Sequence, residues 1–103
     1  MPHLAWIYIL TNKYNTTLYV GATNNLPTRL WEHKTKRNPK CFTAQYNICK
    51  LIYYKGFDSM EDALNREKFM KGKTRKWKEA LIKTMNDGWK DLTEDQEWSV
   101  KWE

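Results

Sequence analysis

The sequence predicts a small α+β domain in which helices flank a three-stranded antiparallel sheet, in the order β-β-α-β-α-α. The chain has 103 residues, a length that suits one domain. Two runs of β-forming residues near the N-terminus are separated by a polar turn, which is typical of a hairpin. Two amphipathic stretches with capping residues in the second half predict helices.

The N-terminal hairpin is predicted from residues 5–10, a turn over residues 12–15 and a second strand over residues 16–22. Side chains alternate between the two faces of a strand. The purely aliphatic positions of both strands are expected to form the core face. Tyr8 and Tyr19 then lie side by side on the opposite face.

A helix over residues 26–36 is expected next, because Asn and Thr caps and a proline suited to the first turn precede its apolar residues. Arg29 and His33 are four residues apart and therefore share one face of this helix. Residues 35–44 are polar and basic and predict a loop. Two tyrosines beside a helix that carries an arginine and a histidine indicate a functional site rather than a plain core.

A third strand is predicted over residues 47–55, followed by a helix over residues 60–71 that ends at Gly72. The apolar residues of this helix form one stripe, and Glu67 falls inside it. A lone carboxylate on a buried face is costly unless it is paired or bound to a metal ion. Glu67 is therefore a candidate metal ligand.

The last predicted helix covers residues 74–85, where Trp77 and Met85 belong to an amphipathic stripe expected to be core. We divide the chain into a domain over residues 1–86 and an acidic, Trp-containing tail over residues 87–103. The tail is expected to fold back on the same domain, with at most one short helix.

The charge of the chain is unevenly distributed. The formal net charge is +6. Residues 1–83 hold sixteen Lys and Arg against six Asp and Glu, which leaves +10, whereas residues 84–103 are net acidic. A basic body predicts a polyanionic partner such as a nucleic acid.

Other features narrow the class of protein. The two cysteines, Cys41 and Cys49, do not form a CxxC pair, so a zinc site is not expected. The first ten residues lack the pattern of a signal peptide, and no apolar run approaches membrane-spanning length. We therefore expect no membrane association and a reducing, cytoplasmic location.

The short motifs Trp6-Ile7-Tyr8 and Tyr19-Val20-Gly21, followed in order by Arg29, His33 and Glu67, resemble the signature of the GIY-YIG nuclease superfamily. The second half of the chain is similar to small single-domain UPF0213-type members. The resemblance covers about residues 4–85. It implies the GIY-YIG fold and a metal-dependent endonuclease that hydrolyses DNA phosphodiester bonds, on structured or damaged DNA in repair or recombination. RNA stays an alternative substrate.

The resemblance also implies the roles of the site residues. Glu67 would bind one divalent ion, Mg²⁺ or Mn²⁺, which prefers oxygen ligands. Tyr8 or Tyr19 would accept the proton of the attacking water, and we favour Tyr8 as this base, with Tyr19 on the phosphate. Arg29 would stabilise the pentacovalent phosphate, and His33 would orient the phenol or accept its proton.

Several further residues are expected to bind the substrate. Gly21 would let the nucleic acid approach the backbone closely. Two basic runs flank the predicted site and would contact phosphates without reading sequence. Their candidate residues are Lys34, Lys36, Arg37, Lys71, Lys73 and Arg75.

The sequence also departs from the family pattern. Trp6 replaces the usual glycine, and Lys78 and Glu79 stand where well-studied members have a supporting asparagine. These departures keep open a second hypothesis, a nucleic-acid-binding module with little or no catalysis. A third is an accessory subunit whose acidic tail docks on a larger protein partner. A homodimer is also consistent with the small size.

Overall fold

The computed structural model describes residues 3–35 and 46–94. This part of the chain confirms the predicted α+β class and element order. A short 3₁₀ turn, η1, is added near the end. The elements are β1 (Ala5–Thr11), β2 (Leu18–Thr23), α1 (Leu26–Thr35), β3 (Lys50–Phe57), α3 (Met60–Lys71), α4 (Arg75–Lys83) and η1 (Leu92–Glu94).

The three strands form one antiparallel sheet in the order β2-β1-β3, so β1 is central and β2 is an edge strand. Tyr8 in the middle of β1 lies opposite Gly21 on one side and Tyr54 on the other. The pairing of β1 with β3 shifts between Ile9 and Leu10. This irregularity adds one residue to β3, and as a result Ile52 and Tyr53 both join the same core cluster.

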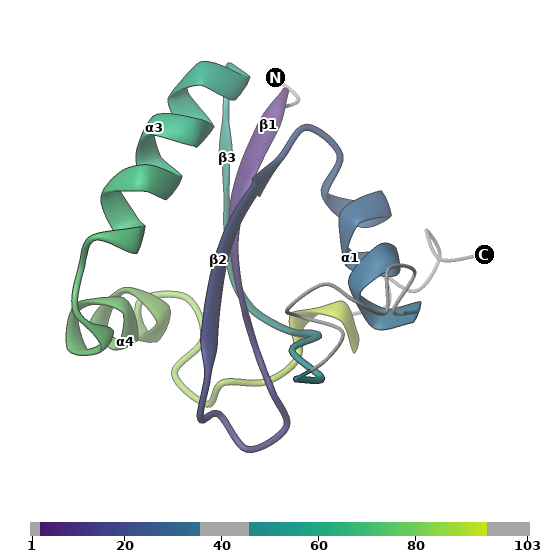
Figure 1. Cartoon of the computed structure of the whole chain (residues 1–103), viewed down its shortest axis with the longest axis vertical. Helices are drawn as coiled ribbons and strands as arrows, with labels where there is room; N and C mark the ends of the chain where they lie inside the picture. The colour runs from purple at the N-terminus through teal and green to yellow at the C-terminus, as the bar shows by residue number, and fades with distance from the viewer. Residues whose placement is uncertain (1–2, 36–45, 95–103) are drawn as a thin grey trace.

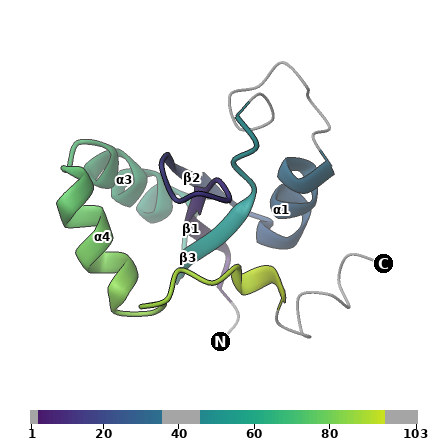
Figure 2. The same cartoon turned by 90° about the horizontal axis from the view of Figure 1, so that it is seen from below.

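Helices cover both faces of the sheet. Figure 1 shows α3 and α4 on one side of the strands and α1 on the other, and the view from below in Figure 2 shows the same three layers. The expectation of one core face was therefore wrong. The face that carries Tyr8 is also buried, because α1 packs against it.

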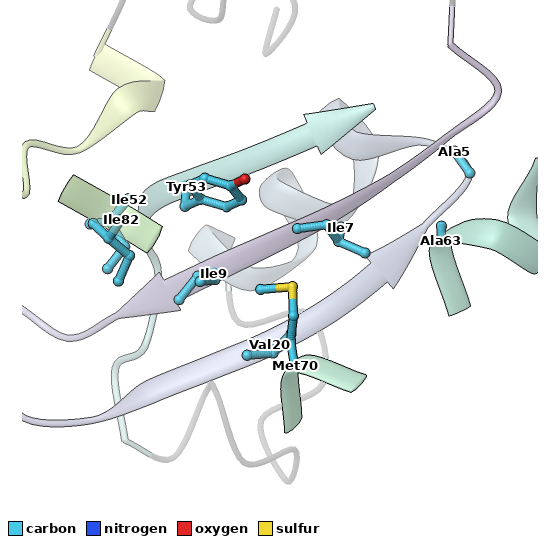
Figure 3. Close-up of a cluster of buried hydrophobic side chains, with 9 residues drawn as sticks. All are labelled: Ala5, Ile7, Ile9, Val20, Ile52, Tyr53, Ala63, Met70 and Ile82. Carbon is cyan, nitrogen blue, oxygen red and sulfur yellow. The ribbon is translucent and has the colours of Figure 1, made fainter. Parts of the chain in front are cut away.

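The first core cluster lies between the sheet and the pair α3 and α4, as Figure 3 shows. Its members are the aliphatic side chains that the strand alternation assigned to the core, joined by inward residues of both helices. Burial of these side chains supplies the main apolar contribution to stability. The cluster contains Ala5, Ile7, Ile9, Val20, Ile52, Tyr53, Ala63, Met70 and Ile82.

The second core cluster lies under α1 and is smaller. Leu26 and Leu30 of α1 pack on Tyr8 and Leu10 of β1, with Ile48 and Leu51 beside them. All six residues are almost completely buried. A tyrosine thus occupies the centre of an apolar layer, which is unusual because its hydroxyl group then needs a hydrogen-bond partner.

Local signals set the starts of the helices. Asn25 accepts a hydrogen bond from the Thr28 amide, and Ser59 accepts one from the Asp62 amide. Thr74 caps α4 in the same way. The predicted range of α3, including its end at Gly72, is confirmed.

Most boundaries differ from the prediction by one to three residues, and two of the differences have an identifiable cause or consequence. β3 begins at Lys50 rather than residue 47, because Asn47 adopts a left-handed conformation with a φ of 55° that breaks the strand. α4 ends at Lys83, so Met85 lies beyond the helix and is exposed rather than core. Ile82 is the buried residue of α4.

The segment after α4 is tied to the sheet by Asn86. This buried side chain donates hydrogen bonds to the carbonyl groups of Ile52 and Lys90, at 3.2 and 2.7 Å, and accepts one from the Lys90 amide at 3.0 Å. Leu92 then packs on the second core cluster, and Thr93 is buried. The described part of the predicted tail, residues 87–94, therefore lies on the domain, whereas residues 95–103 lie outside the described residues.

In the described ranges, no helix has both the length and the apolar character needed to cross a membrane. Cys49 is a free, half-buried thiol, and Cys41 lies outside those ranges.

Replacing Asn86 with alanine is expected to lower the free energy of unfolding by about 2 kcal/mol, because buried carbonyl and amide groups lose their partner. Urea denaturation measures the change. Asn65→Ala, on the exposed side of α3, is the matched control and should shift stability by no more than about 0.5 kcal/mol. Equal effects of the two substitutions would contradict the assigned role of Asn86.

Candidate active site

Tyr8 is at the centre of the candidate site. Its side chain is only 1% exposed, on the central strand beneath α1. The ring extends across Gly21 of the neighbouring edge strand. A Cβ atom at Gly21 would overlap the Cζ and Oη atoms of Tyr8. The absence of a side chain at Gly21 therefore leaves room for the phenol, and this is the role that the structure gives to the glycine.

His33 reaches the same phenol from α1. Leu26, Leu30 and His33 are spaced at i, i+4 and i+7, so His33 extends the buried stripe of the helix by one turn. Its Nε2 atom lies 3.2 Å from the Tyr8 hydroxyl group, within hydrogen-bond distance. The bond gives the buried Tyr8 hydroxyl group a partner.

Tyr19 is the third aromatic ring of the site. It lies on the same face of β2 as the Gly21 position, two residues away. Its ring centroid is 6.3 Å from that of Tyr8 and 5.8 Å from that of His33. The prediction that strand alternation would bring the two tyrosines together is confirmed. Unlike Tyr8, Tyr19 is only partly buried.

Glu67 belongs to α3, in the opposite layer. Because α3 packs on edge strand β2, Glu67 approaches the phenol from the edge of the sheet. Its side chain is 20% exposed, and its carboxylate lies 3.6 Å from the ammonium group of Lys71. The Lys71 ammonium also lies 5.9 Å from the centre of the Tyr19 ring. One lysine therefore links the carboxylate to the aromatic cluster.

Charged groups from both layers act on Tyr8. Burial raises the pKa of Tyr8 well above its ordinary value, and Tyr19 raises it further. The Arg29 guanidinium lowers this pKa, while the carboxylates of Glu67 and Glu32 raise it. All four of the other predicted catalytic residues therefore act on Tyr8, either by contact or by charge.

The environment keeps His33 neutral. Burial lowers the pKa of His33 to about 4, and the nearby Arg29 guanidinium contributes to the decrease, which Glu32 partly offsets. At neutral pH the ring is therefore uncharged and has one nitrogen able to accept a proton.

Arg29 lies at the border of the site, where its side chain is 47% exposed. Its guanidinium is 3.7 Å from the Glu32 carboxylate. Glu32 was not among the predicted site residues. The i, i+3 spacing of an acid after Arg29 was the available signal, because such pairs are neighbours on a helix.

The predicted phosphate-binding residues fall in different places. Lys71 lies at the site, and Lys73 lies beyond the end of α3, with its ammonium 4.3 Å from the centre of the Phe69 ring. Arg75 donates hydrogen bonds to the carbonyl groups of Asn15 and Thr16 at 2.6 and 2.9 Å and to Glu79 at 2.9 Å. Arg75 therefore holds the β1–β2 turn against α4.

Other basic candidates cannot be placed in the site. Lys36 and Arg37 lie outside the described residues, as does the side chain of Lys34.

The sequence of the chain matches a known family. Residues 4–80 match the GIY-YIG catalytic domain. The chain belongs to this family. The predicted resemblance is thereby confirmed, and membership places the chain in a nuclease superfamily.

Relatives in the GIY-YIG family include small proteins of similar length. A UPF0213 protein of Streptococcus pneumoniae serotype 4 is 33% identical over 87 residues, which cover 84% of this chain and 86% of the relative. The UPF0213 protein SpyM3_1077 of Streptococcus pyogenes serotype M3 is 40% identical over 81 residues, covering 78% and 86% of the two chains.

A solved structure shares the fold. The solution NMR structure of the UPF0213 protein BH0048 from Bacillus halodurans superimposes with a TM-score of 0.54 and 24% identity. The match covers 89% of this chain and 96% of that one. It supports the assignment of the GIY-YIG fold to this chain.

Gly21→Ala is expected to destabilise the protein by about 1–3 kcal/mol, because the new methyl group overlaps the buried Tyr8 ring. The midpoint of urea denaturation measures this loss. Gly72→Ala is the matched control, since a Cβ there meets its nearest atom at an ordinary 3.6 Å. The control should change stability by less than about 1 kcal/mol. Similar midpoints for both variants would contradict the close approach of Tyr8 to Gly21.

The buried ring of His33 should make stability depend on pH. Its pKa is about 4 in the folded protein and about 6.5 in the unfolded chain, so the unfolded state binds more protons between these values. The stabilising contribution is therefore complete above pH 6.5 and is lost as the pH falls towards 4. It amounts to at most about 3 kcal/mol.

Urea denaturation at several pH values between 4 and 7 tests this expectation. His33→Gln should show a weaker dependence than the wild type. His3→Gln is the control, because His3 is exposed and lies outside the site. If His33→Gln retained the full pH dependence of the wild type, the effect would have another origin.

Proposed function

We propose that this protein is a metal-dependent endonuclease that hydrolyses phosphodiester bonds in structured or damaged DNA, as in repair or recombination. The observation that carries the proposal is the convergence on one phenol. Tyr19, His33, Arg29 and Glu67 come from three elements, one in each layer, and each acts on Tyr8 by contact or charge. Residues that followed one another in the sequence only by chance would not be expected to surround one side chain in the fold.

Glu67 is the residue that would hold a divalent ion, Mg²⁺ or Mn²⁺. Its carboxylate is partly exposed at the sheet edge, and the described residues contain no group of three acidic, histidine or cysteine side chains that would form a complete cage. One carboxylate completed by water and substrate phosphate suits Mg²⁺. Such an ion would neutralise charge on the phosphate and stabilise the leaving oxygen.

Tyr8 serves as the general base with the help of His33. The raised pKa of Tyr8 leaves it protonated at neutral pH, so a free phenolate is scarce. Nε2 of neutral His33 lies 3.2 Å from the phenol and can accept its proton while Tyr8 takes the proton of the attacking water. This relay avoids a buried phenolate and favours Tyr8 over Tyr19 as the base.

The half-exposed Arg29 then provides the positive charge for the phosphate. Its guanidinium is held beside the phenol yet reaches solvent, and its planar donors suit phosphate oxygens. Tyr19 and Lys71, whose ammonium lies 5.9 Å from the centre of the Tyr19 ring, would contact the phosphate from the other side. Negative charge on the non-bridging phosphate oxygens would then lie between these groups, where fixed donors stabilise it best.

The basic body supports a nucleic acid as the substrate, with DNA as the first choice and RNA as the alternative. Residues 1–86 form the nuclease domain of this proposal, and the described part of the acidic tail, residues 87–94, lies on it. A cytoplasmic protein that acts as a homodimer or with a larger partner fits this small domain.

A cleavage assay tests the proposal. Linear, nicked, flapped and four-way DNA would be incubated with Mg²⁺, Mn²⁺ or EDTA. Glu67→Gln is expected to lower the rate at least about 100-fold, because several kcal/mol of charge stabilisation are lost. Its melting temperature should change little, since the Glu67–Lys71 pair is partly exposed.

Glu61→Gln is the matched control. It removes an exposed acid from the first turn of the same helix and should leave the cleavage rate unchanged. Cleavage that persisted in Glu67→Gln, or that needed no metal, would contradict the proposal.

One observation favours a second function, a nucleic-acid-binding module without catalysis. Glu67 already has a cationic partner in Lys71, which compensates the charge of its carboxylate without a metal ion. In this case the wild type and Glu67→Gln bind DNA equally in EDTA, with strong dependence on salt and no products. An accessory subunit would differ because removal of residues 95–103 would abolish assembly with its larger partner.

A further inference from the structure

A separate cavity of about 350 Å³ lies near the β1–β2 turn, away from Tyr8. It is lined by Asn12, Lys13 and Tyr14 of the turn and by Tyr46 and Asn47, which precede β3. Figure 1 shows the β1–β2 turn and the segment that leads into β3 at the same, lower end of the sheet. Its volume is within the range of small-ligand pockets, roughly 300–1,000 Å³.

The two tyrosines of this cavity are unusually exposed. Tyr14 is 76% exposed and Tyr46 is 57% exposed, whereas the tyrosines in the strands are buried or half-buried. The Lys13 ammonium lies 5.8 Å from the centre of the Tyr14 ring. Exposed aromatic rings beside a cation are the groups that bind an unstacked base and its phosphate.

Hydrogen bonds fix the turn that forms one wall of the cavity. The Asn12 amide oxygen accepts hydrogen bonds from the amides of Thr16 and Thr17, and its nitrogen donates to the Thr16 hydroxyl group. Arg75 fixes the same turn from α4. A site built on a fixed turn loses little conformational entropy when a ligand binds.

We propose that this cavity binds an unpaired nucleobase of the substrate, which stacks on Tyr14 or Tyr46 while the Asn47 amide and Lys13 contact its polar edge and phosphate. The inference rests on the proposed function, because it specifies which class of substrate the proposed nuclease prefers. The preferred substrate has single-stranded nucleotides beside the bond that is cut.

The position of the cavity along β1 sets the spacing. Asn12 follows Tyr8 by four residues, which corresponds to roughly 13 Å along a strand. That length spans about four stacked nucleotides, or fewer when the bases are unstacked. The bound base should therefore lie within four nucleotides of the scissile phosphate, on the unpaired strand.

Binding in EDTA to a labelled DNA flap tests the site without cleavage. Flaps with one abasic nucleotide at each of the four positions next to the junction remove the base but keep every phosphate. Wild-type protein should lose about tenfold in affinity at one of these positions, the usual effect of losing one stacked base. The double variant Tyr14→Ala, Tyr46→Ala should bind the intact flap about tenfold more weakly and show no further loss on the abasic one.

Control variants separate stacking from structural effects. Tyr14→Phe with Tyr46→Phe keeps both rings and should bind like the wild type. Asn47→Gly keeps the left-handed backbone conformation but removes the amide, and should reduce discrimination among bases. An RNA flap of the same sequence shows which nucleic acid supplies the base. The preferred nucleic acid should lose more affinity when one base is removed.

The proposal is overturned if the alanine variant binds intact and abasic flaps as the wild type does. It is also overturned if the variant loses the same factor on both, since the rings would then not contact the base. The proposed function fails separately, when Mg²⁺ or Mn²⁺ gives no products although base-dependent binding is present. Cleavage with no dependence on the two tyrosines would leave the nuclease intact and remove only this site.

Discussion

The structure depends on the burial of one phenol at the centre of the sheet. Tyr8 lies on the middle strand, covered by α1, with its ring across Gly21 and its hydroxyl group on His33. A buried hydroxyl group without a partner would cost about 1–3 kcal/mol, so this position requires a hydrogen-bonding residue on the covering helix. It also requires a residue without a side chain on the neighbouring strand. One buried group thereby determines the residue types at two distant positions.

The two faces of the sheet bury different kinds of side chain. The face under α3 and α4 is almost wholly apolar and supplies most of the hydrophobic stabilisation. The face under α1 contains fewer aliphatic side chains, and a tyrosine and a histidine complete it. Polar groups that are poorly solvated have shifted pKa values, as those of Tyr8 and His33 are. The first core cluster can therefore hold the fold, while the second contains the polar groups of the candidate site.

Strand alternation and helical spacing predicted which site residues would meet. Period-two alternation correctly placed Tyr8 and Tyr19 on one face of the sheet. The apolar stripe predicted for α3 correctly placed Glu67 on the side of the helix that faces the protein, where its side chain is 20% exposed. The sequence did not reveal that α1 covers the tyrosine face, because Leu26 and Leu30 are its only buried aliphatic residues and His33 occupies the next inward position. The predicted end of α4 was also wrong. The helix ends at Lys83, two residues before the predicted end, so Met85 lies outside it. Arg75 was predicted from charge alone, and charge does not show that backbone carbonyl groups take its donors.

The edge position of β2 connects the two layers in the site. A helix that packs on an interior strand is separated from the opposite face by the sheet itself. α3 contacts the edge strand β2 as well as the central strand, and at Gly21 the edge strand has no side chain to screen the phenol. The Glu67 carboxylate can therefore influence a residue on the far face, where Arg29 and His33 approach from α1. The site therefore has an acid on one layer and a cation on the other, and both act on the phenol between them.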